Sequence, residues 1–176
     1  VMTEQNNPFH KKKSGVFFFK SSNPYEFYDL LNGIDMEPTQ DVWGTLIFPE
    51  NAKLPCPVIV PIHGSAGLRE GHHTHMVNLL EAGFAVFRIH HFESRGVISI
   101  VENQTQVTLA TMITDAFRAL ALLNKHPDID KNKIGIMGWS LGGSTALYAA
   151  CQPIIDALTS GDEKFSAYLP LYPGAL

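Results

Sequence analysis

The sequence has few cysteines, no excess of basic charge and no long apolar run. Its two cysteines, Cys56 and Cys151, are too few for a disulfide framework or a four-cysteine zinc site, and we expect free buried thiols. A net charge of −4 argues against nucleic acid as a partner, since phosphate binding needs a basic surface. The longest apolar runs, Val16–Phe19 and Val58–Ile62, are far shorter than the ~20 residues of a membrane span. No membrane partner is therefore expected.

What is present suits one folded domain. The chain has 176 residues, of which 45% are hydrophobic, enough for a substantial core. Residues 1–14 are polar and include Lys11-Lys12-Lys13, which predicts a flexible N-terminal arm before a domain over residues 15–176. The N-terminus has no apolar segment of a secretory signal, but Val1 precedes Met2, so the compartment stays open.

Short apolar runs alternate with segments of helical periodicity. Helices are predicted at Met76–Glu81, at Thr105–Lys125 and from the turn at 138–143 to Cys151. Strands are predicted at Val16–Lys20, Asp41–Phe48, Val58–Ile62, Phe84–Ile89, Lys133–Met137 and Phe165–Leu171, the last as a buried strand. This alternation predicts right-handed βαβ units, and so an α/β fold with a mostly parallel sheet and flanking helices.

One motif carries chemistry. Gly138-Trp139-Ser140-Leu141-Gly142 is a G-x-S-x-G pattern between a predicted strand and a predicted helix, the setting that a nucleophile elbow requires. The sharp turn would project the hydroxyl of Ser140 from the top of the sheet, and the flanking glycines let strand and helix approach closely. The N-terminus of the following helix would direct the N–H of Leu141 at the substrate as one oxyanion donor.

The second oxyanion donor is expected in the loop after an earlier strand. His63-Gly64-Ser65-Ala66-Gly67 follows the predicted strand Val58–Ile62 directly. The N–H of Ser65 is the first choice and that of Ala66 the second, because two such donors stabilise the tetrahedral oxyanion of acyl transfer. An ordinary glycine-rich turn is the alternative.

These motifs together resemble the α/β-hydrolase fold and, within it, the dienelactone hydrolase family. The resemblance covers residues 40–174 and rests on Asp41–Pro49, the HGSAG loop, Phe92–Gly96, His126–Asp130, GWSLGG and Tyr172-Pro173-Gly174. It implies a serine hydrolase of small-molecule carboxylic esters or lactones that needs no metal or other cofactor. A serine peptidase or acyltransferase with the same elbow, and a non-catalytic binding protein of this fold, remain alternatives.

The order of the triad in this fold is Ser, then Asp or Glu, then His. No histidine follows Ser140, and the only later acidic residues, Asp156, Asp162 and Glu163, precede the last predicted strand. We therefore expect an incomplete domain, truncated after the strand that follows the nucleophile helix, which carries only the nucleophile and oxyanion hole and has little activity alone. The exposed sheet edge would pair with the C-terminal remainder of the protein or with another chain.

Four further residues near the expected site have candidate roles. Arg95 could bind a substrate carboxylate in a bidentate fork or form a loop salt bridge with Glu93 or Glu70. His63 is expected to shape the oxyanion loop by hydrogen bonding, and His90 to alter the substrate pocket. Trp139 could line that pocket or simply pack. The cluster His72, His73 and His75 with His90 and His91 has only weak metal-site spacing, so no metal is expected.

Overall fold

The computed structural model describes residues 14–160 and 163–174, and these form one six-stranded mixed sheet flanked by helices. The strand order is β1-β2-β4-β3-β5-β6. The strands are β1 (Gly15–Ser21), β2 (Gln40–Ile47), β3 (Cys56–Ile62), β4 (Ala85–Ile89), β5 (Ile129–Trp139) and β6 (Ala167–Leu171). Strands β4, β3, β5 and β6 run parallel, whereas β1 and β2 are antiparallel, so the predicted α/β class with a mostly parallel sheet is confirmed.

The centre of the sheet is apolar on both faces. In β3, Val58, Val60 and Ile62 are fully buried, as expected of a parallel strand covered by helices on both sides. The prediction of a buried last strand is wrong. Strand β6 lies at the edge of the described sheet, and Leu169 is 43% exposed there because no further described strand or helix covers it.

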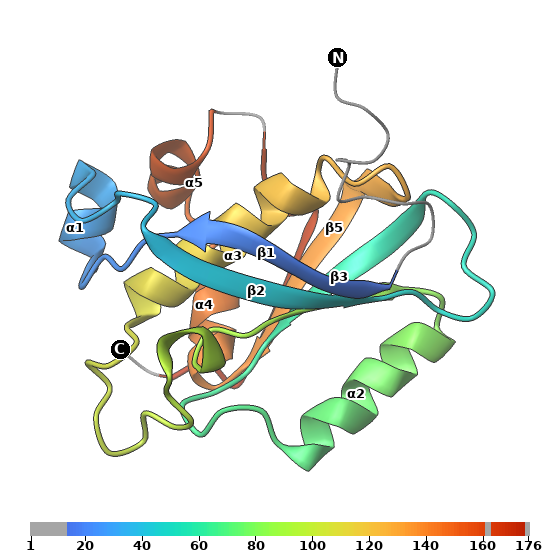
Figure 1. The fold of residues 1–176 in the computed structure, drawn as a ribbon, viewed down its shortest axis with the longest axis horizontal. Coiled ribbons are helices and arrows are strands. Elements are labelled where there is room, and N and C mark those ends of the chain that lie inside the picture. The colour runs from blue at the N-terminus through green and yellow to red at the C-terminus, as the bar shows by residue number, and fades with distance from the viewer. Residues whose placement is uncertain (1–13, 161–162, 175–176) are drawn as a thin grey trace.

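The helices divide between the two faces of the sheet (Figure 1). Helix α2 (Glu70–Glu81) lies alone on one side, whereas α1, α3, α4 and α5 gather on the other. The bounds of these four helices are Phe27–Asn32, Leu109–Leu123, Leu141–Tyr148 and Gln152–Leu158. Two of them, α1 and α5, are not predicted from the sequence, since helices of 6 and 7 residues show too little periodicity.

Two predicted helix starts are corrected by capping contacts. Helix α3 begins at Leu109 rather than Thr105, because the hydroxyl of Thr108 accepts the N–H of Thr111 and so caps the helix. Helix α2 begins at Glu70, six residues before the predicted Met76, where His72 accepts a backbone N–H from Arg69.

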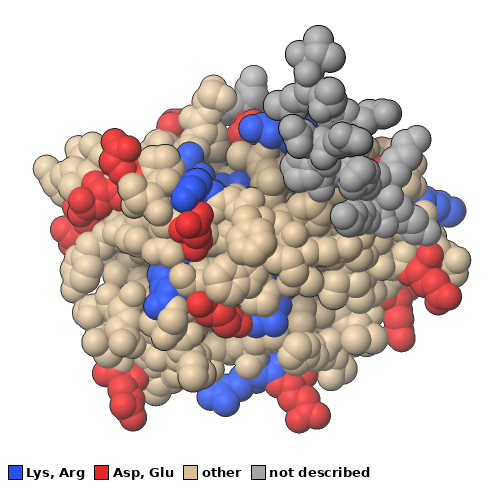
Figure 2. All heavy atoms as spheres, viewed as in Figure 1, with Lys and Arg blue, Asp and Glu red and all other residues tan. Residues whose placement is uncertain are grey.

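Other predictions concern the surface and the chain ends. The predicted arm, residues 1–14, lies outside the described residues except for Ser14, whose hydroxyl accepts the N–H of Phe48. Cys56 is buried and Cys151 half-buried, and both thiols are free. No helix in the described ranges is long and apolar enough to cross a membrane. On the face seen in Figure 2, acidic and basic side chains are interspersed.

Candidate active site

Ser140 lies between the end of β5 and the start of α4, in a backbone conformation that residues with a side chain rarely adopt. Its torsion angles are φ 55° and ψ −115°. The N–H of Ser140 donates to the carbonyl oxygen of Leu171 at the end of β6, which holds the turn against the neighbouring strand. Leu141 is the first residue of α4, so its N–H belongs to the first helical turn and has no acceptor within the helix.

The two glycines of the turn allow a very close approach of backbones. A Cβ on Gly138 would overlap the carbonyl group of Gly142, and a Cβ on Gly142 would overlap the carbonyl oxygen of Ile62 at the end of β3. Only glycine fits at both positions without moving the backbone. The turn after β5 is thereby packed directly on the end of β3.

The loop after β3 lies beside the serine. A Cβ built on Gly64 would be 3.3 Å from the Cβ of Ser140 and 3.9 Å from its Oγ. The carbonyl oxygen of Ser65 accepts the N–H of Ile100 at 2.8 Å, and its hydroxyl donates to Gln104. The segment that follows β4 therefore supports this loop from outside.

A cavity of about 280 Å³ is lined both by the HGSAG loop and by the turn that carries Ser140. Ser65, Ala66 and Trp139, three of the residues selected from the sequence, line it together with Ser140. The remaining lining residues are Gly64, Gly67, Arg69, His72, Val101 and Tyr172. His72, Val101 and Tyr172 could not be selected for this cavity from the sequence, because they come from α2, from the loop after β4 and from the residue that follows β6.

Trp139 both packs and lines the cavity, so the two readings of this residue coexist. Its side chain is 2% exposed and packs in one apolar cluster with Ile59 and Met137. The ring of His72 stacks on it, with 4.3 Å between ring centroids and an interplanar angle of 22°. His75 also touches it, at 5.6 Å between centroids.

His63 is buried behind the HGSAG loop and bonds to it. Its Nδ1 lies 2.9 Å from the carbonyl oxygen of Gly64, the contact expected of a residue that shapes this loop. Desolvation, and then the neighbouring His91, lower the pKa of His63 from 6.5 to about 4. The ring is therefore neutral near pH 7, and Nδ1 donates its proton to the carbonyl.

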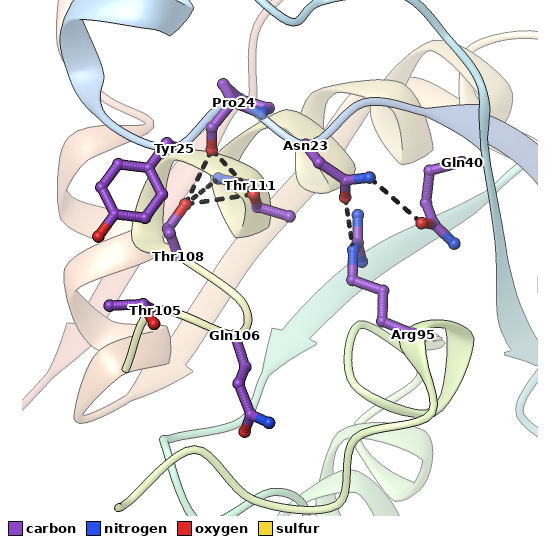
Figure 3. A pocket seen from close by; sticks show the side chains of 9 residues that line it. All are labelled: Asn23, Pro24, Tyr25, Gln40, Arg95, Thr105, Gln106, Thr108 and Thr111. Carbon is purple, nitrogen blue, oxygen red and sulfur yellow. Dashed lines mark hydrogen bonds between the residues drawn. The ribbon is translucent and has the colours of Figure 1, made fainter. Parts of the chain in front are cut away.

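Arg95 is engaged in a network of hydrogen bonds, of which Figure 3 shows the contact with Asn23. Its guanidinium forms two parallel bonds with the carboxylate of Asp115, at 2.9 and 3.0 Å, and its Nε donates to Asn23. His91 and Ser21 bond to the same carboxylate at 2.8 and 2.5 Å. Burial would raise the pKa of Asp115, but the bond from His91 and the charge of Arg95 outweigh it and hold the pKa below 3.8.

This network corrects the predicted salt bridge of Arg95. The partner is Asp115, in α3, and neither Glu93 nor Glu70; Glu93 pairs with Arg88 instead. The other prediction for Arg95 is a contact with substrate. Its guanidinium is bonded to Asp115, and Arg95 lines a different cavity from the one that Ser140 lines. Sequence spacing could not reveal a partner on a helix 20 residues away.

His90 also lies apart from the Ser140 cavity. Its Nε2 is 2.8 Å from the hydroxyl of Thr45, and its ring stacks on Trp43 at 5.8 Å between centroids. The histidines considered for a metal do not converge: His72 and His75 lie against Trp139, whereas His90 bonds to Thr45 and His91 to Asp115. Within residues 14–160 and 163–174, no group of three or more His, Cys, Asp or Glu side chains is arranged to hold a metal ion.

Comparisons with known proteins show the family and the fold. The family described as BD-FAE matches residues 45–168, which is more than half of the chain and includes both the HGSAG loop and the elbow. No curated protein sequence matches significantly.

Solved structures share the fold. A Klebsiella pneumoniae protein assigned to the dienelactone hydrolases superposes with a TM-score of 0.55 at 18% identity over 80% of this chain. The dienelactone hydrolase of Anabaena variabilis gives 0.53 at 21% identity over 80%. Est1E of Butyrivibrio proteoclasticus, solved with ferulic acid bound, gives 0.51 at 25% identity over 62%. The chain spans 57%, 58% and 43% of these three proteins, respectively.

Proposed function

The chain belongs to the BD-FAE family of α/β-hydrolases, related to the dienelactone hydrolases, and from this premise we propose that it carries the nucleophile and oxyanion hole of a serine esterase. The observation that carries the proposal is the placement of Ser140. A serine with φ 55° at a strand-to-helix turn faces a glycine-rich loop across a cavity of about 280 Å³. This is the arrangement by which a nucleophile elbow presents its hydroxyl.

The proposed chemistry is acyl transfer through a covalent intermediate. The Oγ of Ser140 attacks the ester carbonyl and gives its proton to a general base, and the carbonyl oxygen becomes an oxyanion. The N–H groups of Leu141 and Ser65, with Ala66 as the alternative to Ser65, stabilise that charge. The collapse of the intermediate expels the alcohol, which takes the proton back from the base, and water then releases the acid.

The general base is proposed to come from outside the described residues. Three of the described histidines already have hydrogen-bond partners: His63 has Gly64, His91 has Asp115, and His72 has the N–H of Arg69. Strand β6, next to β5, has an outer edge with which no described strand pairs. We propose that the polypeptide that supplies the acid and the histidine joins the sheet there.

The substrate is proposed to be a small carboxylic ester or lactone. The related Est1E binds ferulic acid, the acid product of such an ester, which supports this class over peptides. The wall of the cavity, with Trp139, Val101 and Tyr172, also suits an apolar or aromatic acyl group. A serine peptidase or acyltransferase is the competing function, and peptide substrates beside p-nitrophenyl esters separate these classes.

A fluorophosphonate probe tests the proposal, because it labels only a serine that a base activates. We expect a Ser140 adduct in the intact mass of the protein together with its completing polypeptide, and no adduct for the 176 residues alone or for Ser140→Ala. Ser144→Ala, four residues along α4, is the matched control and keeps its label. An adduct on another serine, or none when the completing polypeptide is present, would contradict the proposal.

A further inference from the structure

A histidine in the wall of the Ser140 cavity is fixed from two sides. The face of His72 stacks on Trp139, and its Nδ1 accepts the backbone N–H of Arg69 at 3.0 Å. A neutral imidazole has one N–H and one acceptor nitrogen, so the acceptor role of Nδ1 places the proton on Nε2. His72 therefore brings an oriented N–H donor to a cavity wall.

The same contacts decide that His72 acts as a donor and not as a base. Desolvation lowers the pKa of His72, and the charges of His75, His73 and Arg69 lower it further. The ring is therefore neutral near pH 7. The lone pair that a general base would need is the one on Nδ1, which is already bonded to the N–H of Arg69.

The cavity holds the acyl side of an ester. The alcohol departs toward the general base, which protonates it, and the base of the proposed esterase comes from outside the described residues. In that esterase the alcohol side of the ester lies toward the polypeptide that supplies the base, and the acyl side lies against the residues that line this cavity. The carbonyl oxygen has its own donors at Leu141 and Ser65, which leaves the N–H of His72 for another atom.

Resting on the esterase function proposed above, we propose that His72 determines acyl specificity by donating its Nε2–H to a second oxygen in the acyl group. Its neighbours Trp139, Val101 and Tyr172 present mainly apolar surface. A donor in such a wall is left unpaired by a hydrocarbon chain and is satisfied by an ether, hydroxyl or carbonyl oxygen. Oxygen-bearing acyl groups are selected over hydrocarbon groups of the same length.

Two variants separate this role from helix capping. His72 is the third residue of α2, where Gln and Glu can both accept the N–H that Arg69 donates. His72→Gln keeps that acceptor and adds an amide N–H donor, whereas His72→Glu keeps the acceptor and presents no donor. His75→Gln is the control, because His75 touches Trp139 but does not line the cavity.

The probes are N-methylamides of matched acids that differ by one oxygen in place of a methylene. The pairs are methoxyacetic with butanoic, 3-methoxypropanoic with pentanoic, and 4-methoxybutanoic with hexanoic acid. Dissociation constants come from ligand-observed NMR titrations. We expect the ether of at least one pair to bind about 3- to 10-fold more tightly to the unmodified protein, His72→Gln and His75→Gln. That preference is lost in His72→Glu.

Two results would overturn the inference: no pair that favours the ether, or a preference that survives in His72→Glu. Binding of an amide requires no bond cleavage, so the outcome does not depend on hydrolysis. The corresponding methyl esters, tested with the completing polypeptide, report on the esterase function separately. Ether preference without ester hydrolysis would contradict that function and leave the role of His72 in binding standing.

Discussion

At the scale of single residues, Ser140 is held in a conformation that costs stability. A non-glycine residue at such torsion angles is strained by about 1–3 kcal/mol, and the surrounding structure must hold it there. The bond from its N–H to Leu171 and the tight packing of the turn on β3 provide that support. The strained backbone and the exposed side chain therefore occur at the same residue, Ser140.

Relief of that strain is measurable. We expect Ser140→Gly to raise the free energy of unfolding by about 1 kcal/mol relative to Ser140→Ala, since glycine adopts positive φ readily but loses more chain entropy on folding. Both variants lack the hydroxyl, so the comparison isolates the backbone. Urea denaturation followed by circular dichroism measures the difference. Equal stability of the two variants would show that the turn is not strained.

At the scale of elements, the start of α4 is set by how closely it meets β3. Gly142 sits where a side chain would overlap the carbonyl oxygen of Ile62. Gly71, in α2, has open space around the position of a Cβ. The two helical glycines therefore differ in what an added methyl group would do.

Alanine at these two positions should have opposite effects. Gly142→Ala is expected to lower the free energy of unfolding by about 3 kcal/mol, because the backbone must move to admit the methyl group. Gly71→Ala is expected to raise it by about 0.5–1 kcal/mol through the better helix propensity of alanine. Thermal and urea unfolding of both variants measure this. A Gly142→Ala protein as stable as Gly71→Ala would contradict the close packing described here.

The sequence predicted the mostly parallel sheet and the strand-to-helix turn at Ser140 because both depend on local patterns: buried apolar runs, and a serine between a strand and a helix. It could not predict the cavity wall, since His72 and Tyr172 reach Trp139 and Ser140 only through tertiary packing. It also missed Asp115 as the partner of Arg95, because nothing in the spacing of the two residues shows that they meet in the folded chain. Long-range pairing of buried polar groups is visible only in the folded chain.

At the scale of the whole molecule, buried polar groups make stability depend on pH. His63 is 2% exposed, and its ring lies edge-on to that of His91, 5.7 Å away between centroids. Its pKa is about 4 in the folded protein against an ordinary value of 6.5. Between these values the unfolded chain binds more protons than the folded one, so stability falls as the pH falls.

The contribution of His63 to the free energy of unfolding is fully present above pH 6.5 and is lost between pH 6.5 and pH 4. It amounts to about 3 kcal/mol at its largest. We expect the free energy of unfolding to fall across this range, and the slope to be shallower in His63→Asn. Thr74→Asn, a change at an exposed residue of α2 that does not titrate, should keep the slope of the unmodified protein. Measurements stop at pH 4, because loss of the ionised form of Asp115 adds to the effect below it. An unchanged slope in His63→Asn would sink this assignment.

The register of β3 against β5 fixes how the site can change over time. Ile62 pairs with Gly138, so the HGSAG loop and the elbow leave adjacent parallel strands at the same level. Neighbouring strands lie ~4.8 Å apart whatever their side chains are. The separation between Ser140 and the HGSAG loop is therefore set by the backbone ladder, while the cavity walls proposed to choose the acyl group come from α2 and the later loops. If the proposed esterase function holds, substitutions in those walls alter selectivity and leave the reacting geometry where it is, so a lineage of such proteins could exchange one ester for another without rebuilding its chemistry.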